Sequence, residues 1–71
     1  MSTTRAKFKC TSVTVTEIGS TILLEPVTQG SPENENFFKW TPFGKIEIGT
    51  INPSVTFNPG KEYYVDFNQV D

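Results

Sequence analysis

The sequence has 71 residues, a formal net charge of −2, one cysteine and no histidine. Its length predicts one domain with a small core, and its mildly acidic balance excludes a general binder of duplex DNA. One cysteine without histidine excludes an intrachain disulfide and a structural zinc site. A domain this small is marginally stable without such supports, so we expect a homo-oligomer.

The first predicted strand follows a short polar N-terminus. Residues 1–5 are expected to be disordered, and residues 6–71 to form a single small β domain. Along the strand, apolar side chains stand at alternate positions, first even and then odd: Ala6, Phe8, Cys10, Val13 and Val15. The change of phase predicts a β-bulge after Cys10, which is itself interpreted as a small buried hydrophobe.

A second strand is predicted over residues 21–28, after a turn at Gly19 and Ser20. Pro26 cannot donate a backbone hydrogen bond, so we expect it at an edge or a bend. The stretch "QGSPENEN", residues 29–36, contains no apolar residue and many turn-forming residues. It is therefore predicted to be a loop.

An aromatic hairpin is predicted next. Its first strand is residues 37–41, and "TPFG" forms the turn. By alternation, Phe38 and Trp40 share one face of this strand, which we assign to the core. Phe37 and Lys39 share the other face, which is then exposed or covered by another subunit.

The C-terminal third completes the predicted sheet. Residues 45–51 form the second strand of the hairpin, and "NPSV" predicts at most one short helical turn near 53–56, capped by Asn52. "NPGK" predicts a type II turn before a last strand over residues 62–68. Tyr63, Val65 and Phe67 share one face of this strand, and we assign Tyr63 and Phe67 to the core.

Together, five short antiparallel strands predict an all-β fold, closed as a small barrel or folded as a compact sandwich, OB-like or SH3-like. No apolar run is long enough for a membrane span or a signal segment, since the longest is residues 22–24. We therefore expect a soluble intracellular protein that does not associate with membranes.

Catalytic chemistry is not expected. No histidine can act as a base, the eight acidic residues are scattered, and the five glycines are isolated rather than gathered in a phosphate-binding loop. The sequence therefore predicts a binding protein and not an enzyme, with no cofactor and no metal.

Aromatic side chains interleaved with lysines are the feature that points to binding. Aromatic rings can stack on bases while ammonium groups contact phosphates, and the same rings can equally cover a subunit interface. The sequence leaves both interpretations open. The candidate residues for contact with a ligand or partner are Lys7, Lys9, Phe37, Lys39, Phe43, Lys45 and Tyr64.

Two stretches, "SPENENFFKWTPFGKIEIGTINP" and "FNPGKEYYVDF", resemble a family of short, functionally unassigned proteins of tailed bacteriophages. The resemblance covers about residues 6 to 67. It implies phage origin, synthesis in the bacterial host cytoplasm, and an accessory role in binding a host protein or a small nucleotide, with a counter-defence role among the options. A virion structural component of the capsid or tail, and a binder of single-stranded nucleic acid, are the alternatives.

Overall fold

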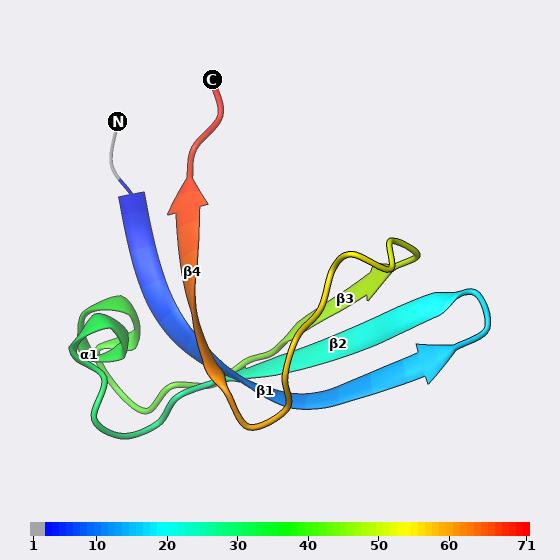
Figure 1. Cartoon of the computed structure of the whole chain (residues 1–71). Coiled ribbons are helices and arrows are strands. Elements are labelled where there is room, and N and C mark those ends of the chain that lie inside the picture. The colour runs from blue at the N-terminus through cyan, green and yellow to red at the C-terminus, as the bar shows by residue number, and fades with distance from the viewer. Residues whose placement is uncertain (1–2) are drawn as a thin grey trace.

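The computed structural model describes residues 3–71. Within that range, four antiparallel strands and one short helix follow in the order β1 (Thr3–Thr16), β2 (Gly19–Pro26), α1 (Pro32–Phe38), β3 (Ile46–Thr50) and β4 (Glu62–Asn68). The strands form one sheet in the order β3-β2-β1-β4, curled into an open half-barrel (Figure 1). The prediction of an antiparallel β fold is confirmed, whereas the prediction of five strands is wrong.

β1 is one of the two central strands and causes the curl. Its N-terminal half pairs with β4, its C-terminal half pairs with β2, and the register shifts between Cys10 and Ser12. The predicted bulge is therefore confirmed, and the strand bends sharply along its length (Figure 1). β1 already begins at Thr3, so residues 3–5 pair with β4 although disorder was expected there, while residues 1–2 lie outside the described range.

The core lies on the concave face of the sheet. Its buried side chains come from the two central strands: Ala6, Phe8, Cys10, Ile22 and Leu24. Cys10 is fully buried, as predicted. β4 has the predicted bounds, and Tyr63 and Val65 pack against the core. The assignment of Phe67 to the core is wrong, because this side chain is 48% exposed near the end of the strand. The predicted turn before β4 is also confirmed, with Gly60 at φ 89°.

The helix is the main departure from the sequence prediction. α1 replaces the last part of the predicted loop 29–36 and the start of the predicted strand 37–41. Ser31 caps the helix, Pro32 begins it, and two glutamates lie in its first turn. This is a helix-start signal that is visible in "SPENE", but the absence of apolar residues there favoured a loop.

Because residues 37–41 do not form a strand, the predicted aromatic hairpin is wrong, and only β3 remains of it. The expected helical turn near 53–56 is a β-turn, closed by a 3.1 Å bond from the Val55 N–H to the Asn52 carbonyl. Asn52 still caps this turn, since its side chain accepts a 2.9 Å bond from the Ser54 N–H.

Gly19 lies at the start of β2 and not in the centre of a turn. A Cβ at this position would lie 2.4 Å from the Thr50 carbonyl oxygen. The glycine therefore permits β3 to approach β2 closely.

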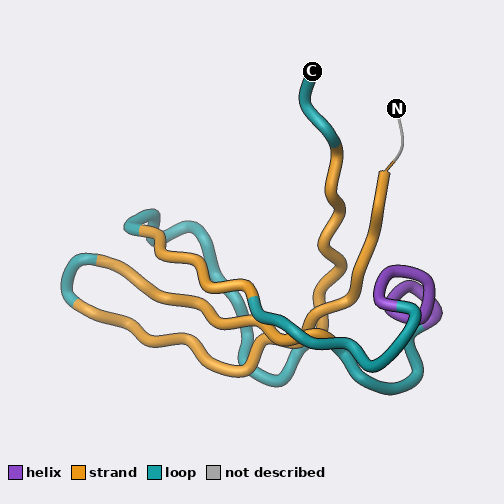
Figure 2. Tube along the Cα trace, turned by 180° about the vertical axis from the view of Figure 1, so that it is seen from behind, coloured by secondary structure: helices purple, strands orange, loops and turns teal. Residues whose placement is uncertain are grey.

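The helix lies beside the N-terminal half of β1, at the end of the molecule away from the β1–β2 turn (Figure 2). In the part of the chain that the structure describes, no helix has the length and apolar character needed to cross a bilayer.

Candidate functional site

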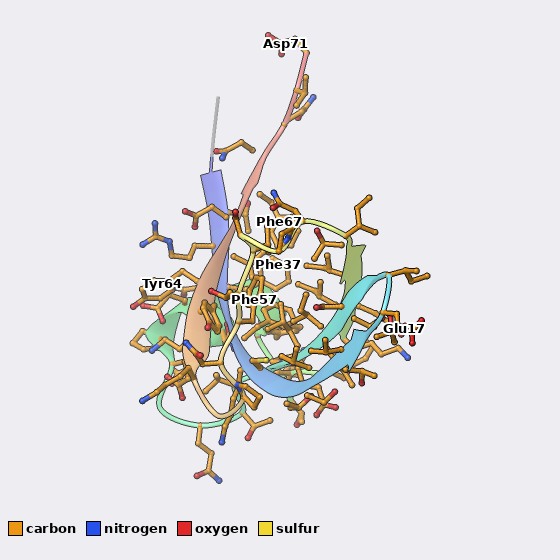
Figure 3. The ribbon with its side chains drawn as sticks, turned by 45° about the vertical axis from the view of Figure 1, so that its right-hand side comes forward. Glu17, Phe37, Phe57, Tyr64, Phe67 and Asp71 are labelled. Carbon is orange, nitrogen blue, oxygen red and sulfur yellow. The ribbon has the colours of Figure 1, made fainter. Side chains whose placement is uncertain are left out.

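The seven candidate residues lie in two separate places. Three of them, Lys7, Lys9 and Tyr64, lie on the sheet face opposite the core, which we call the convex face. The other four belong to residues 37–45, which we call the aromatic segment. Figure 3 shows Phe37 and Phe67 inside the curl of the sheet and Tyr64 outside it.

Cations on the convex face are matched by acids. The Arg5 guanidinium donates two hydrogen bonds to the Asp66 carboxylate, at 2.6 and 2.9 Å. These bonds hold the pKa of the Asp66 carboxyl below its ordinary value and raise the pKa of Arg5. The same guanidinium lies 4.7 Å from the centre of the Tyr64 ring, within range of a cation–π interaction.

The two lysines of β1 are flanked in the same way. The Lys7 ammonium lies 3.8 Å from the Glu33 carboxylate and 3.9 Å from that of Glu62. Lys9 lies opposite a glutamate on each neighbouring strand. Since these positive charges are balanced locally, the convex face offers a weak site for phosphate groups.

Asn34 fixes α1 to the sheet. β2 ends at Pro26, opposite Phe8, so the edge of β1 beyond this point has no strand beside it. The Asn34 side chain takes that place: its Oδ1 accepts a 2.6 Å bond from the Lys7 N–H. Its Nδ2 donates 2.7 Å bonds to the carbonyls of Lys7 and Val27. The side chain is 2% exposed, so these bonds are shielded from water.

The start of α1 is held by a second set of contacts. The Ser31 hydroxyl accepts a 3.2 Å bond from the Asn34 N–H and donates a 2.9 Å bond to the Glu33 carboxylate. The hydroxyl bond, aided by the nearby charge of Lys7, lowers the pKa of Glu33.

The end of α1 is strained and turns the chain outward. Lys39 has φ 68° and ψ −41°, and the Trp40 N–H donates a 2.7 Å bond to the Phe38 carbonyl. These values describe a γ-turn with positive φ, a rare conformation for a residue with a side chain. Lys39 is the only non-glycine residue with positive φ within residues 3–71.

Beyond this turn the aromatic segment is exposed. Trp40 is 80% exposed and Phe43 is 84% exposed, so the assignment of Trp40 to the core is wrong. The assignment of Phe38 is confirmed in part, because it is half-buried and packs against the core. Phe37 contacts the rings of Phe38 and Phe67, with ring centres 4.8 and 5.9 Å apart. Trp40 was misassigned because alternation applies only to a strand, and residues 37–41 do not form one.

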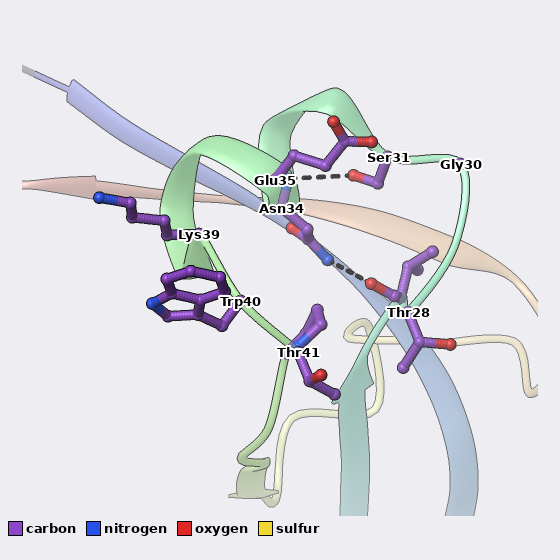
Figure 4. A pocket seen from close by; sticks show the side chains of 10 residues that line it. Thr28, Gly30, Ser31, Asn34, Glu35, Lys39, Trp40 and Thr41 are labelled. Atoms are coloured by element: carbon purple, nitrogen blue, oxygen red, sulfur yellow. Dashed lines mark hydrogen bonds between the residues drawn. The ribbon is translucent and has the colours of Figure 1, made fainter.

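A cleft of about 280 Å³ lies beside Trp40. Trp40 and Lys39 lie on one side of it and Thr28 and Gly30 on the other, with Asn34 between them (Figure 4). Neither Lys39 nor Lys45 forms an ion pair with any other residue in the described range. The cleft therefore combines an exposed indole, the Lys39 ammonium, which has no ion-pair partner within residues 3–71, and the carboxylate of Glu35.

Two residues that line this cleft, Trp40 and Asn34, were missing from the sequence-based candidates. Within residues 3–71, no three cysteine or acidic side chains gather into a possible metal site. No protein-family model matches the chain, and no match was found among curated proteins or among solved structures.

Proposed function

We propose that this chain is a non-enzymatic accessory protein of a tailed bacteriophage, made in the host cytoplasm, which acts as a homo-oligomer and binds a host protein through the aromatic segment. The observation that carries the proposal is the exposure of Trp40 and Phe43, at 80% and 84%. Large aromatic side chains that stand in water are typical anchors of protein interfaces. The resemblance to phage proteins supports the biological setting.

The aromatic segment is better suited to a protein partner than the convex face. Its aromatic side chains are accompanied by Lys39 and Lys45, which have no acidic partner within residues 3–71. An apolar centre with a charged rim is the usual anatomy of a protein interface. The complementary partner presents an apolar pocket bordered by acidic residues.

A capture experiment with matched variants tests this proposal. The tagged wild type, a Trp40→Ser/Phe43→Ser double variant and a Tyr64→Ser control are incubated with host lysate, and bound proteins are quantified by mass spectrometry. Tyr64 is also an exposed aromatic residue, but it lies on the convex face. We expect at least one protein to bind the wild type and the control and to be reduced tenfold or more with the double variant.

Equal binding by all three proteins would contradict a role for the aromatic segment. Loss of binding with Tyr64→Ser alone would move the interface to the convex face. Circular dichroism of each variant shows whether a lost interaction is due to unfolding.

The cleft beside Trp40 favours a second candidate function, the binding of a small nucleotide. A flat base can stack on the exposed indole while its phosphate contacts the Lys39 ammonium. The volume of about 280 Å³ lies just below the usual range for ligand sites, which begins at ~300 Å³. A mononucleotide is thus a better fit than a longer oligonucleotide.

Trp40 is the only tryptophan in the sequence, so its fluorescence reports directly on this cleft. We expect saturable quenching by nucleoside monophosphates, and weaker binding after Lys39→Gln. Equal quenching by the uncharged nucleosides would contradict a role for Lys39. A flat response to linear and cyclic nucleotides would contradict nucleotide binding altogether.

A further inference from the structure

The concave face of the sheet is apolar but incompletely covered. None of the residues that face inward from β2, β3 and β4 is charged. Apart from Ser20 and Thr50 at one end, those that line the face are aliphatic or aromatic: Ile22, Leu24, Ile46, Ile48, Tyr63, Val65 and Phe67. Phe57, from the segment between β3 and β4, packs on Tyr63 with ring centres 4.9 Å apart. Phe57 does not cover the rest of the face. Phe67 is 48% exposed, and Phe37, which contacts it from α1, is 40% exposed.

The molecule is also too open for a compact monomer. In a typical domain a sheet packs against a second layer of secondary structure. Here that second layer is only one helix of 7 residues and a segment without regular structure. The radius of gyration is 13.4 Å, against about 11 Å for a compact chain of this length. The smallest dimension is 16 Å, so the protein is thin as well as extended.

The excess surface is sufficient for a stable interface. A compact monomer of 8.0 kDa exposes about 4,450 Å², whereas this chain exposes 5554 Å². The difference of roughly 1,100 Å² exceeds the ~800 Å² that each partner buries in a standard protein interface. Closing the open face would therefore bring the protein near the exposure of an ordinary small domain.

We infer that a second copy of this chain packs against the concave face, with Phe37 and Phe67 of each protomer meeting those of the other. A twofold interface brings the same patch of both subunits together. Because the strand positions of this patch carry no charge, two copies can meet without repulsion between like charges. The pairing supplies the second layer that the half-barrel lacks. The inference rests on the homo-oligomer of the proposed function and identifies the surface that forms it.

Light scattering with matched variants tests the inference. The wild-type full chain is expected to have twice the 8.0 kDa mass of one protomer, and its melting temperature should rise with protein concentration. Phe67→Glu places a charge in the apolar face, and we expect it to weaken dimerisation at least 100-fold. Tyr64→Glu is the control, because Tyr64 belongs to the same strand with 54% exposure but lies on the convex face.

Each outcome supports or overturns the inference. A wild type that is monomeric, with a melting temperature independent of concentration, overturns it without affecting the test of the aromatic segment. A dimer that persists in Phe67→Glu and in Phe37→Glu overturns the choice of face but leaves the homo-oligomer intact. If Phe67→Glu fails to fold, Phe37→Glu decides, since that residue lies on the surface of α1.

Discussion

The two ends of α1 are built in opposite ways. At the first end, Asn34 is buried and makes three hydrogen bonds to backbone groups of two other segments. At the other end, Lys39 is strained and Trp40 is exposed to water. A small protein that anchors one end of a short helix so firmly can hold the other in an exposed, strained conformation. Under the proposed function, this arrangement would let the helix present the aromatic segment to the partner.

The strongest test of this comparison removes the anchor. Asn34→Ala leaves the Lys7 N–H at the edge of β1 without its partner and also removes both bonds from Nδ2. We expect a loss of about 2–4 kcal/mol in the free energy of unfolding, measured by urea denaturation. That is close to the whole stability of a domain of this size.

Asn36→Ala is the matched control, because this asparagine lies on the same helix but is exposed. Its expected effect is within about 0.5 kcal/mol. If the two variants were equally stable, Asn34 would not be the anchor.

The second test compares Phe38 and Trp40, the residues on either side of the γ-turn. Phe38→Ala should cost about 2 kcal/mol, roughly half the value for a fully buried phenylalanine, because Phe38 is partly buried against the core. Trp40→Ala should change stability by less than about 0.5 kcal/mol, because the indole is 80% exposed. Thermal denaturation of both variants measures the difference. A large loss in Trp40→Ala would mean that the indole packs against the fold.

The third test relieves the strain at the end of the helix. Glycine adopts positive φ without a steric penalty, so Lys39→Gly should stabilise the fold by about 0.5–1 kcal/mol. Lys45→Gly controls for the added flexibility, since Lys45 does not have a positive φ. It should be neutral or destabilising. A loss of stability in Lys39→Gly as large as that in Lys45→Gly would show that the γ-turn carries no strain.

The smallest expected effect is a pH dependence at the anchored end. The pKa of Glu33 is lowered in the folded state, so its ionised form stabilises the fold above the ordinary value of 4.5. That contribution is lost as the pH falls through the lower pKa of the folded protein. The melting temperatures of wild type and Glu33→Gln should therefore differ at pH 7 and converge in acid. Glu17→Gln, in the β1–β2 turn, controls for the change in net charge, and a difference that persists at low pH would exclude this linkage.

The sequence by itself determined the parts of the fold that depend on neighbouring residues. Alternation at Ala6, Phe8 and Cys10 gave the direction of the core in β1, and its change of phase located the bulge. The bounds of β4 and the turn before it could be predicted in the same way. A strand that buries one face carries a period of two in its own residues, so this information is local.

Only the tertiary structure decided the helix and the exposure of Trp40. α1 begins with polar residues, and its stabilising partner is the backbone of Lys7, which lies 27 positions earlier in the sequence than Asn34. The γ-turn at Lys39 then decides which aromatic side chains reach the core and which face water. A side chain that completes the edge of a distant strand leaves no periodic pattern in the sequence, because its partners are backbone groups that every residue type except proline carries.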